Sequence, residues 1–406
     1  MNSASAFLLA ARQCEIAELE QLARTGELVT AIARFVHGLQ RERGMSNIFL
    51  GSQGARFGAE RLRQIAQCKD AEHAVRGQLS RLDTPAAQVR NGSRLFSRVA
   101  MVLHGLDALP QLRERIGALG IGAREATADY VRLIGGLLAV VFEAADSATD
   151  PQVSRALVAL FNLMQGKEFA GQERALGASV FASGRVDGET RQQWRHLVES
   201  QQACLQVFAA FAAPEILAAG QVGAGPAVQA ALEQLRRIGC AGAAAPLNPD
   251  LSQDWYDTCT RRIDAMRGIE ELQAAHLREL CESRIVQART ELHDQRALLG
   301  ALAADPGELG AATPPYGPHL ERSLPALLQD QARRLQAMAD ELEAVRATLT
   351  ERKVVERAKG LLMAHRNMRE DEAYKALRQM AMNQNRRLVD VAAAVLSLAE
   401  VLPGGR

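Results

Sequence analysis

The sequence is poor in aromatic residues, which make up 4% of its 406 positions. Strands favour aromatic and β-branched side chains, whereas Ala, Leu, Arg, Glu and Gln, which recur throughout this chain, favour helices. No run of alternating strand residues stands out. We therefore expect an all-α fold, and the length predicts two or three domains rather than one core.

Cysteine is scarce and scattered, with no C-x-x-C pair and no histidine at zinc-finger spacing. Neither a disulfide framework nor a structural metal site is predicted. The sequence also lacks the Glu-x-x-His pair of ferritin-like proteins and a glycine-rich phosphate loop after a strand. We therefore expect no metal, no cofactor and no enzymatic activity. The six cysteines are Cys14, Cys68, Cys204, Cys240, Cys259 and Cys281.

Long apolar runs are also missing. The most apolar stretches, residues 133–142 and 204–213, have roughly half the length needed to cross a bilayer. The first residues lack the basic start, apolar stretch and cleavage site of a secretory signal. We expect a cytoplasmic protein without a membrane partner.

An excess of charge of one sign is absent as well. The chain has 48 basic and 47 acidic residues, for a net charge of +1. The whole chain is therefore neither a polycation suited to nucleic acid nor an acidic tail protein, and any basic face must be local.

Residues 4–302 show a succession of helical patterns with breaks near residues 83–85, 117–122, 184–188 and 220–226. Long helices with short connections favour antiparallel bundles. The region also repeats itself in order: residues 42–46 resemble residues 173–177, and residues 111–117 resemble residues 234–239. We interpret this as two related helical bundles, about 25–150 and 151–300.

Residues 303–318 are rich in proline and glycine, and this composition predicts a linker. After it, leucines recur every seven residues, which is coiled-coil spacing. These are Leu328, Leu335, Leu342 and Leu349. The pattern spans about three heptads and slightly favours a parallel homodimer over a helix packed on its own N-terminal region.

An arginine motif interrupts an apolar helical pattern at Arg41, Glu42 and Arg43. A buried guanidinium needs a carboxylate or an anionic ligand, and its planar fork of donors suits a planar oxyanion. Arg174 stands in the second copy among small residues. Two interpretations stay open: the two arginines flank one small anion, or Arg43 pairs with Glu42 or another acid and Arg174 with Glu173 on solvated faces.

The first motif resembles the signature of the nitrate- and nitrite-sensing (NIT) domain family. Its residues are Leu39-Gln40-Arg41-Glu42-Arg43-Gly44-Met45-Ser46, followed by Phe49-Leu50-Gly51-Ser52. The resemblance covers about residues 25–300 and includes residues 171–175 and the helix around Trp255. It implies two paired four-helix bundles and a nitrate or nitrite ligand bound by arginines. The implied ligand residues are Arg43 and Arg174, then Arg236, then Arg41 and Arg113. The second copy has Ala175 where the first has Gly44, so whether both copies touch the ligand stays open.

The C-terminal region, from residue 350 onward, shows three amphipathic helical patterns. Residues 351–387 contain ten basic and five acidic side chains, a local charge of +5. A compact basic module suits a phosphate backbone, although a charged run is also typical of a solvated helix face.

This region resembles the ANTAR domain of transcription antitermination regulators at residues 351–363, 372–374, 377–378, 381–382 and 391–392. The resemblance implies a three-helix bundle that binds leader RNA with two hairpins and prevents formation of a terminator. Small Gly360 and Ala373 are then expected at close-packing positions. The expected RNA contacts are Arg352, Lys359, Tyr374 and Arg378.

Together the two resemblances predict a nitrate- or nitrite-responsive antitermination regulator with leader RNA as its partner. We expect a sensor of two paired four-helix bundles over residues 1–302, a linker and long helix over 303–349, and a small three-helix RNA-binding bundle over 350–402. The alternative is a sensor of another small anion that acts as a DNA-binding or other nucleic-acid-binding regulator.

Overall fold

The computed structural model describes residues 4–82, 85–223, 225–240, 247–304, 318–366, 368, 370–384 and 386–401. Across these residues all regular secondary structure is α-helical, which confirms the predicted all-α fold. The helices are α1 (Ala4–Gly51), α2 (Gly58–Leu82), α3 (Pro85–Gly117), α4 (Ala123–Ser147), α5 (Pro151–Ser183), α6 (Gly188–Phe211), α7 (Pro214–Gly223), α8 (Gly225–Cys240), α9 (Leu251–Ala304), α10 (Pro318–Arg366), α11 (Glu370–Gln384) and α12 (Leu388–Val401). None of the described helices has an apolar stretch of bilayer-spanning length.

Local sequence signals fix both ends of α5, the helix at the centre of the molecule. The carboxylate of Asp150 accepts a hydrogen bond of 3.0 Å from the Val153 amide, and Pro151 occupies the first turn, where no amide donor is needed. At the other end Gly184 adopts φ = 67°, a left-handed conformation that glycine tolerates without strain. Asp187 then caps α6 through the Thr190 amide.

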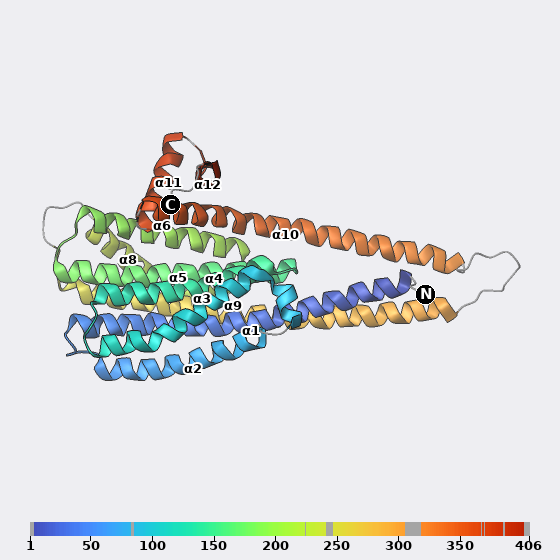
Figure 1. Ribbon diagram of the computed structural model, residues 1–406, viewed down its shortest axis with the longest axis horizontal. Helices are drawn as coiled ribbons and strands as arrows, with labels where there is room; N and C mark the ends of the chain where they lie inside the picture. Colours follow the sequence, from blue (N-terminus) through green and yellow to red (C-terminus); the bar gives the residue numbers. More distant parts are fainter. Residues whose placement is uncertain are drawn as a thin grey trace, which may run out of the picture.

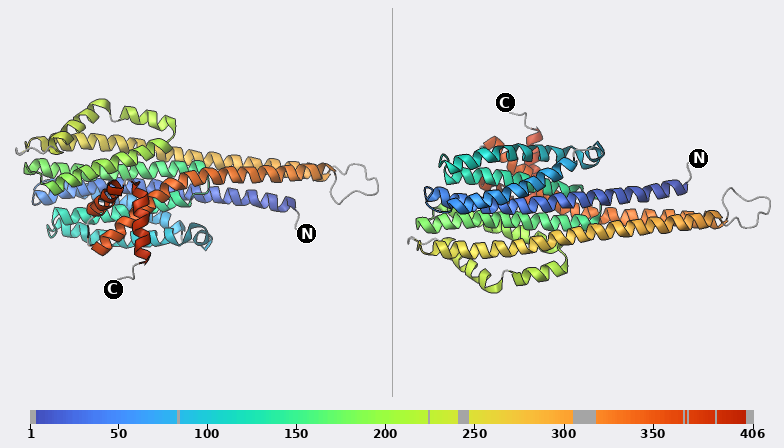
Figure 2. Two further views of the ribbon diagram at one scale, coloured as in Figure 1. Left: turned by 90° about the horizontal axis from the view of Figure 1, so that it is seen from above. Right: turned by 90° about the horizontal axis from the view of Figure 1, so that it is seen from below.

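The helices form two bundles that lie side by side (Figures 1 and 2). In the first, α1 packs against α2 and α4, and α3 packs against α4. In the second, α5 packs against α6 and α9, and α8 packs against α9. Because α1 also packs along α9, and α4 along α5, the bundles share one long interface built from α1, α4, α5 and α9.

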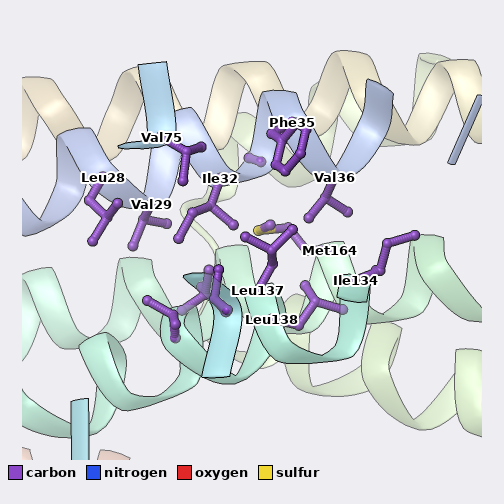
Figure 3. Close-up of a cluster of buried hydrophobic side chains, with 14 of the residues drawn as sticks. Leu28, Val29, Ile32, Phe35, Val36, Val75, Ile134, Leu137, Leu138 and Met164 are labelled. Atoms are coloured by element: carbon purple, nitrogen blue, oxygen red, sulfur yellow. The ribbon is translucent and has the colours of Figure 1, made fainter. Parts of the chain in front are cut away.

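The largest hydrophobic core runs through the first bundle and across this shared interface (Figure 3). Side chains from α1, α2 and α4 meet Met164 of α5 there. The residues labelled in Figure 3 are Leu28, Val29, Ile32, Phe35, Val36, Val75, Ile134, Leu137, Leu138 and Met164. Because one core spans both bundles, a shift of α5 against α1 must disturb close-packed side chains.

A second core, in the second bundle, is aromatic. Trp194 of α6 and Trp255 of α9 meet edge to face with their ring centroids 4.9 Å apart, and Phe181 packs on both. The indoles fit because Gly177 and Gly239 lack side chains, since a Cβ atom at either position would overlap a tryptophan ring. The two tryptophans of the chain therefore serve packing in this bundle.

Helix α10 is continuous from the predicted coiled-coil segment into the C-terminal module. Leu342, Val345 and Leu349 are buried, and the latter two belong to the large core of the sensor bundles. Leu328 and Leu335 are exposed. The second half of the leucine pattern therefore packs on the chain's own bundles. Most of the predicted linker, residues 305–317, lies outside the described residues.

The C-terminal module is the predicted three-helix bundle, made of the end of α10 with α11 and α12. Its small core centres on Ala358, Leu377 and Ala392. Ala373 is fully buried, as expected of a close-packing position. The prediction for Gly360 was wrong, because this residue is exposed and a Cβ atom there would meet nothing within 4 Å.

Candidate functional site

Two arginines cross between the bundles in a reciprocal arrangement. Arg43 of α1 reaches over Gly171 of α5, where a Cβ atom would lie 2.8 Å from its Nη2. Arg174 of α5 reaches over Gly44 of α1, where a Cβ atom would lie 3.3 Å from its Nη2. Each glycine therefore makes room for the guanidinium of the other helix. This explains why both arginine motifs contain a small residue at the crossing.

Arg43 is buried and bound to a buried carboxylate, that of Glu168 on α5. Its Nη1 donates to Glu168 Oε1 at 2.5 Å and its Nη2 to Oε2 at 3.3 Å. Gln40 donates to Oε2 at 2.8 Å, and Gln172 donates to Oε1 at 2.9 Å. The three donor side chains Arg43, Gln40 and Gln172 thus form a cage around one planar oxyanion, which in this conformation is the Glu168 carboxylate.

Arg174 has a different environment. Its Nη1 donates to the Thr260 hydroxyl at 3.0 Å, and its guanidinium lies 4.9 Å from the centre of the Tyr256 ring. Arg174 is buried, with 8% of the residue exposed, yet among the described residues no carboxylate forms an ion pair with it. A nearly buried cation held by a hydroxyl and an aromatic face is suited to an anionic ligand.

His37 lies at this junction of α1, α5 and α9 among several cations. Burial first, and then these cations, lower its pKa from 6.5 to about 2, so the imidazole is neutral at pH 7. The cations responsible are Lys167, Arg267, Arg41 and Arg174. Lys167 is paired with Glu270, so Arg174 is the buried cation among them that is left without a carboxylate in the described residues.

The other two arginines of the repeat are held by glutamates. Arg113 donates from Nε and Nη2 to Glu42 at 2.8 Å each, and the Tyr130 hydroxyl donates to the same carboxylate at 2.7 Å. Arg236 donates to Glu173 at 2.7 and 2.6 Å. Each glutamate directly precedes a crossing arginine, so these two Glu–Arg clamps fix the helix segments that present Arg43 and Arg174.

The pairing expected if these residues bound no anion is confirmed for Arg43 and wrong for Arg174. Arg43 pairs with an acid other than Glu42, the distant Glu168, whereas Glu173 binds Arg236 instead of Arg174. Both pairs are buried, whereas the expectation placed them on solvated faces. Arg41 is exposed.

Sequence reasoning missed the cage around Arg43. Gln40 stands one helical turn before Arg43, and Gln172 stands one turn after Glu168, so helical spacing already placed each pair on one face. The signal for Glu168 was its position, together with Lys167, shortly after the mainly apolar stretch from Ala156 to Met164 of the same helix. A charged residue there requires a buried partner.

A groove of about 920 Å³ separates the bundles from α10. One wall comes from α3, α4 and α5 and includes Glu168, Gln172 and Phe161, and the other comes from residues 350–357 of α10. Six basic and three acidic side chains line it. The basic ones are Arg94, Arg98, Arg132, Arg352, Lys353 and Arg357. Glu168 therefore faces both the arginine cage and a positively charged opening.

The C-terminal module is docked on the bundles through α10. Arg352 donates to the Asn162 side chain at 3.1 Å, and its guanidinium lies 4.7 Å from the centre of the Phe161 ring. Lys353 forms an ion pair with Asp146 of α4. Docking thus engages a residue predicted to contact RNA.

Helix α11 adds a second set of contacts, to α6. The Tyr374 ring lies 4.8 Å from the His196 ring, and Arg378 forms an ion pair with Glu199. Lys375 donates to Gln192 at 2.6 Å. Tyr374 is half-buried, and burial raises its pKa. Figure 1 shows α11 standing beside α6 in this docked position.

Lys359, the fourth residue predicted to contact RNA, is buried and forms an ion pair with Glu356 on the same helix, at 2.9 Å. The structure therefore places three of the four predicted RNA-binding residues, Arg352, Tyr374 and Arg378, against the sensor bundles. Within the described residues no group of His, Cys, Asp or Glu side chains has the arrangement of a metal site.

A buried, arginine-lined cage at the junction of two helical bundles, with a basic module docked on the bundles at the end of the long helix α10, defines a single-chain sensor with its own output domain. The model of the nitrate and nitrite sensing family matches residues 34–278, and the ANTAR domain model matches residues 343–396. The chain belongs to the nitrate- and nitrite-sensing (NIT) family and carries an ANTAR domain.

Relatives over the full length support this assignment. The chain is 36% identical over 390 residues to the nitrate regulatory protein of Klebsiella oxytoca, covering 96% of this chain and 93% of that protein. It also matches the solved structure of the NasR transcription antiterminator at 34% identity and a TM-score of 0.62, over 97% of this chain and 98% of that one.

Proposed function

We propose that this protein is a nitrate- or nitrite-responsive transcription antitermination regulator. Anion binding to the NIT bundles releases or reorients the ANTAR module, which then binds a leader RNA with two hairpins and prevents terminator formation. The observation that supports this most directly is the pair of buried crossing arginines, Arg43 and Arg174, at the interface of the two bundles. The antiterminator relative supports RNA over DNA as the target.

The proposal assigns different roles to the five arginines predicted at the ligand. Arg43 and Arg174 bind the anion, because each reaches across the bundle interface to the helix that carries the other. Arg113 and Arg236 act as positioning residues, since the Nε and Nη2 donors of each already bind a glutamate carboxylate. Arg41 lies on the surface beside the site and contributes charge.

The docked ANTAR module supports a mechanism by release. Arg352, Tyr374 and Arg378, which we propose as RNA contacts together with Lys359, cannot grip RNA while they bind the sensor. The anion must favour the undocked arrangement, because a ligand that binds both arrangements equally shifts neither. The shared core of α1, α5 and α10 provides a packed route between the two sites.

We propose the domain bounds predicted from the sequence, with residues 1–302 as the sensor, 303–349 as linker and connecting helix, and 350–402 as the ANTAR domain. A cytoplasmic location follows from an RNA target. Dimerisation through α10 stays a prediction, and exposed Leu328 and Leu335 are the part of the heptad pattern left for it.

The experiment that tests the sensor is calorimetric titration of the full-length protein with nitrate and with nitrite. We expect saturable binding by the wild type and loss of binding in Arg43→Ala and in Arg174→Ala. The control is Arg132→Ala, because Arg132 lines the groove but does not contact the cage. Absence of heat with both anions, or binding that survives both substitutions, would contradict the proposed ligand site.

A further inference from the structure

We propose that the Glu168 carboxylate is an internal competitor that occupies the anion cage until nitrate or nitrite displaces it. This inference rests on the proposed function and deepens it. It assigns Glu168 as the residue that sets the affinity of the sensor.

The carboxylate is a close chemical stand-in for the ligand. A carboxylate, a nitrite and one edge of a nitrate each present two oxygens in a plane and share a single negative charge. Glu168 receives two donors from Arg43 and one each from Gln40 and Gln172. These are the charge-assisted, bidentate contacts that would bind a planar oxyanion.

The donors of the cage cannot serve both anions at once. The two oxygens of Glu168 already take both terminal nitrogens of Arg43. A nitrate that binds Arg43 in the same bidentate way must therefore displace the carboxylate. The measured affinity is then the intrinsic affinity multiplied by the fraction of molecules in which Glu168 has left.

The structure also provides a place for the displaced carboxylate. Glu168 lines the groove that α10 closes from the other side, and this groove carries an excess of basic side chains. A rotation of the Glu168 side chain moves its charge out of the cage and toward these cations and water. The charge thus avoids burial without a partner, which would otherwise oppose displacement.

Substitution of Glu168 by glutamine tests this inference. Glutamine keeps the size of the side chain but removes the charge that competes with the ligand, and it replaces one acceptor oxygen by an NH2 donor. Calorimetry on the full-length protein is expected to show a Kd for nitrate roughly tenfold lower in Glu168→Gln than in the wild type. Thermal unfolding gives a second measurement: without nitrate the variant melts at a lower temperature, because Arg43 has lost its counter-ion, and nitrate raises its melting temperature more than that of the wild type.

The matched control is Glu143→Gln, which removes a carboxylate from the same groove, where its nearest ion-pair partner is Arg98 at 3.8 Å. Its Kd is expected to equal that of the wild type. A Glu168→Gln protein that binds nitrate as tightly as the wild type, or more weakly, would overturn the competitor role while leaving the sensor function intact. Nitrate binding by neither protein would overturn both, and binding by the variant alone would support the competitor.

Discussion

At the crossing of α1 and α5, the arginine site leaves no room for even one added carbon atom at Gly171. Arg43 lies so close to Gly171 that a methyl group there would meet its Nη2 at 2.8 Å. The Glu168 carboxylate holds the guanidinium from the other side, so the side chain has little freedom to move away. The position of the cage is therefore set by the absence of a side chain at residue 171.

The substitution Gly171→Ala is expected to displace Arg43 and weaken nitrate binding by roughly tenfold, equivalent to about 1.4 kcal/mol. Stability should change little, because alanine favours a helix interior by about 1 kcal/mol over glycine and offsets part of the crowding. Calorimetry and thermal melting of the same samples separate the two effects.

The control is Gly135→Ala on α4, where a Cβ atom would meet nothing within 4 Å. It should stabilise the protein slightly and leave nitrate affinity unchanged. Equal affinities for Gly171→Ala and the wild type would mean that the crossing geometry does not define the ligand site.

At this scale the sequence predicted the crossing arginines but not their partners. Interrupted apolar patterns pointed to Arg43 and Arg174, and burial of both agrees with that signal. Glu168 is far from Arg43 in sequence, and Tyr256 is far from Arg174, so each pair meets only through helix packing. Pairing across helices depends on register and rotation, which the residue spacing within one helix does not determine.

At the scale of helices, the repeat reappears as two matched clamps. Glu42 joins α1 to α3 and α4 through Arg113 and Tyr130. Glu173 joins α5 to α8 through Arg236, and to α6 through Trp194 and Gln201. In each bundle, the glutamate that precedes the crossing arginine therefore holds that helix against the other helices of its bundle.

Glu173→Gln is expected to destabilise the protein by about 3–5 kcal/mol at neutral pH, because it removes the buried counter-ion of Arg236 and leaves only the exposed Glu233. The control Glu233→Gln removes the exposed partner of the same arginine and should cost about 0–1 kcal/mol. Denaturant unfolding followed by circular dichroism measures both values. A cost for Glu173→Gln no greater than that of the control would contradict the clamp.

The Glu173 carboxylate also makes the stability of the protein depend on pH. Burial alone would raise the pKa of Glu173, but hydrogen bonds from Arg236, Gln201 and Trp194 outweigh it and hold this pKa below 4.5. A lowered pKa in the folded state means that the unfolded state binds the proton more readily, so this stability is complete above pH 4.5 and is lost as the pH falls through the folded pKa. The difference between wild type and Glu173→Gln should therefore narrow on acidification.

Most helices were predictable, whereas several breaks between them were not. Gly117, Gly184 and Asp187 gave strong signals, and the structure breaks at residues 118–122 and 184–187. The sequence reading missed the breaks at 52–57 and 212–213. The signals were Gly54, which adopts φ = 83° in the first break, and Pro214, which begins the helix after the second. The positive φ of Gln53 and Phe57 in the first break, unusual for residues with side chains, could not be predicted from local propensity.

At the scale of the whole molecule, the sensor and the ANTAR module form a closed arrangement. The docking contacts are polar and partly exposed, such as Lys353 with Asp146 and Arg378 with Glu199. Exposed ion pairs are individually worth about 0–1 kcal/mol, so a docked state made of several of them can be reversed by a ligand of modest affinity. This suits a switch better than a large apolar interface does.

The sequence predicted both modules from their motifs but not how they meet. The heptad pattern slightly favoured a dimer, yet Leu342 and Leu349 are buried on the same chain, and Leu349 joins its large core. A pattern of about three heptads fits packing on a second copy of α10 or on the chain's own bundles, because the spacing describes the surface of α10 and not the surface that it meets. Charge complementarity across α6 and α11 likewise becomes visible only after folding.

The most direct test of the account is the affinity of the full-length protein for a two-hairpin leader RNA, measured by filter binding with and without nitrate. The wild type should bind the RNA at least roughly tenfold more tightly with nitrate. The double charge reversal Asp146→Arg and Glu199→Arg, which repels Lys353 and Arg378, should bind tightly without it.

Charge reversal at Asp254 and Asp264, both exposed on α9, provides the matched control and should keep the nitrate dependence. RNA affinity that is the same with and without nitrate, in the wild type and in the interface variant alike, would contradict a sensor that controls its RNA-binding module by docking.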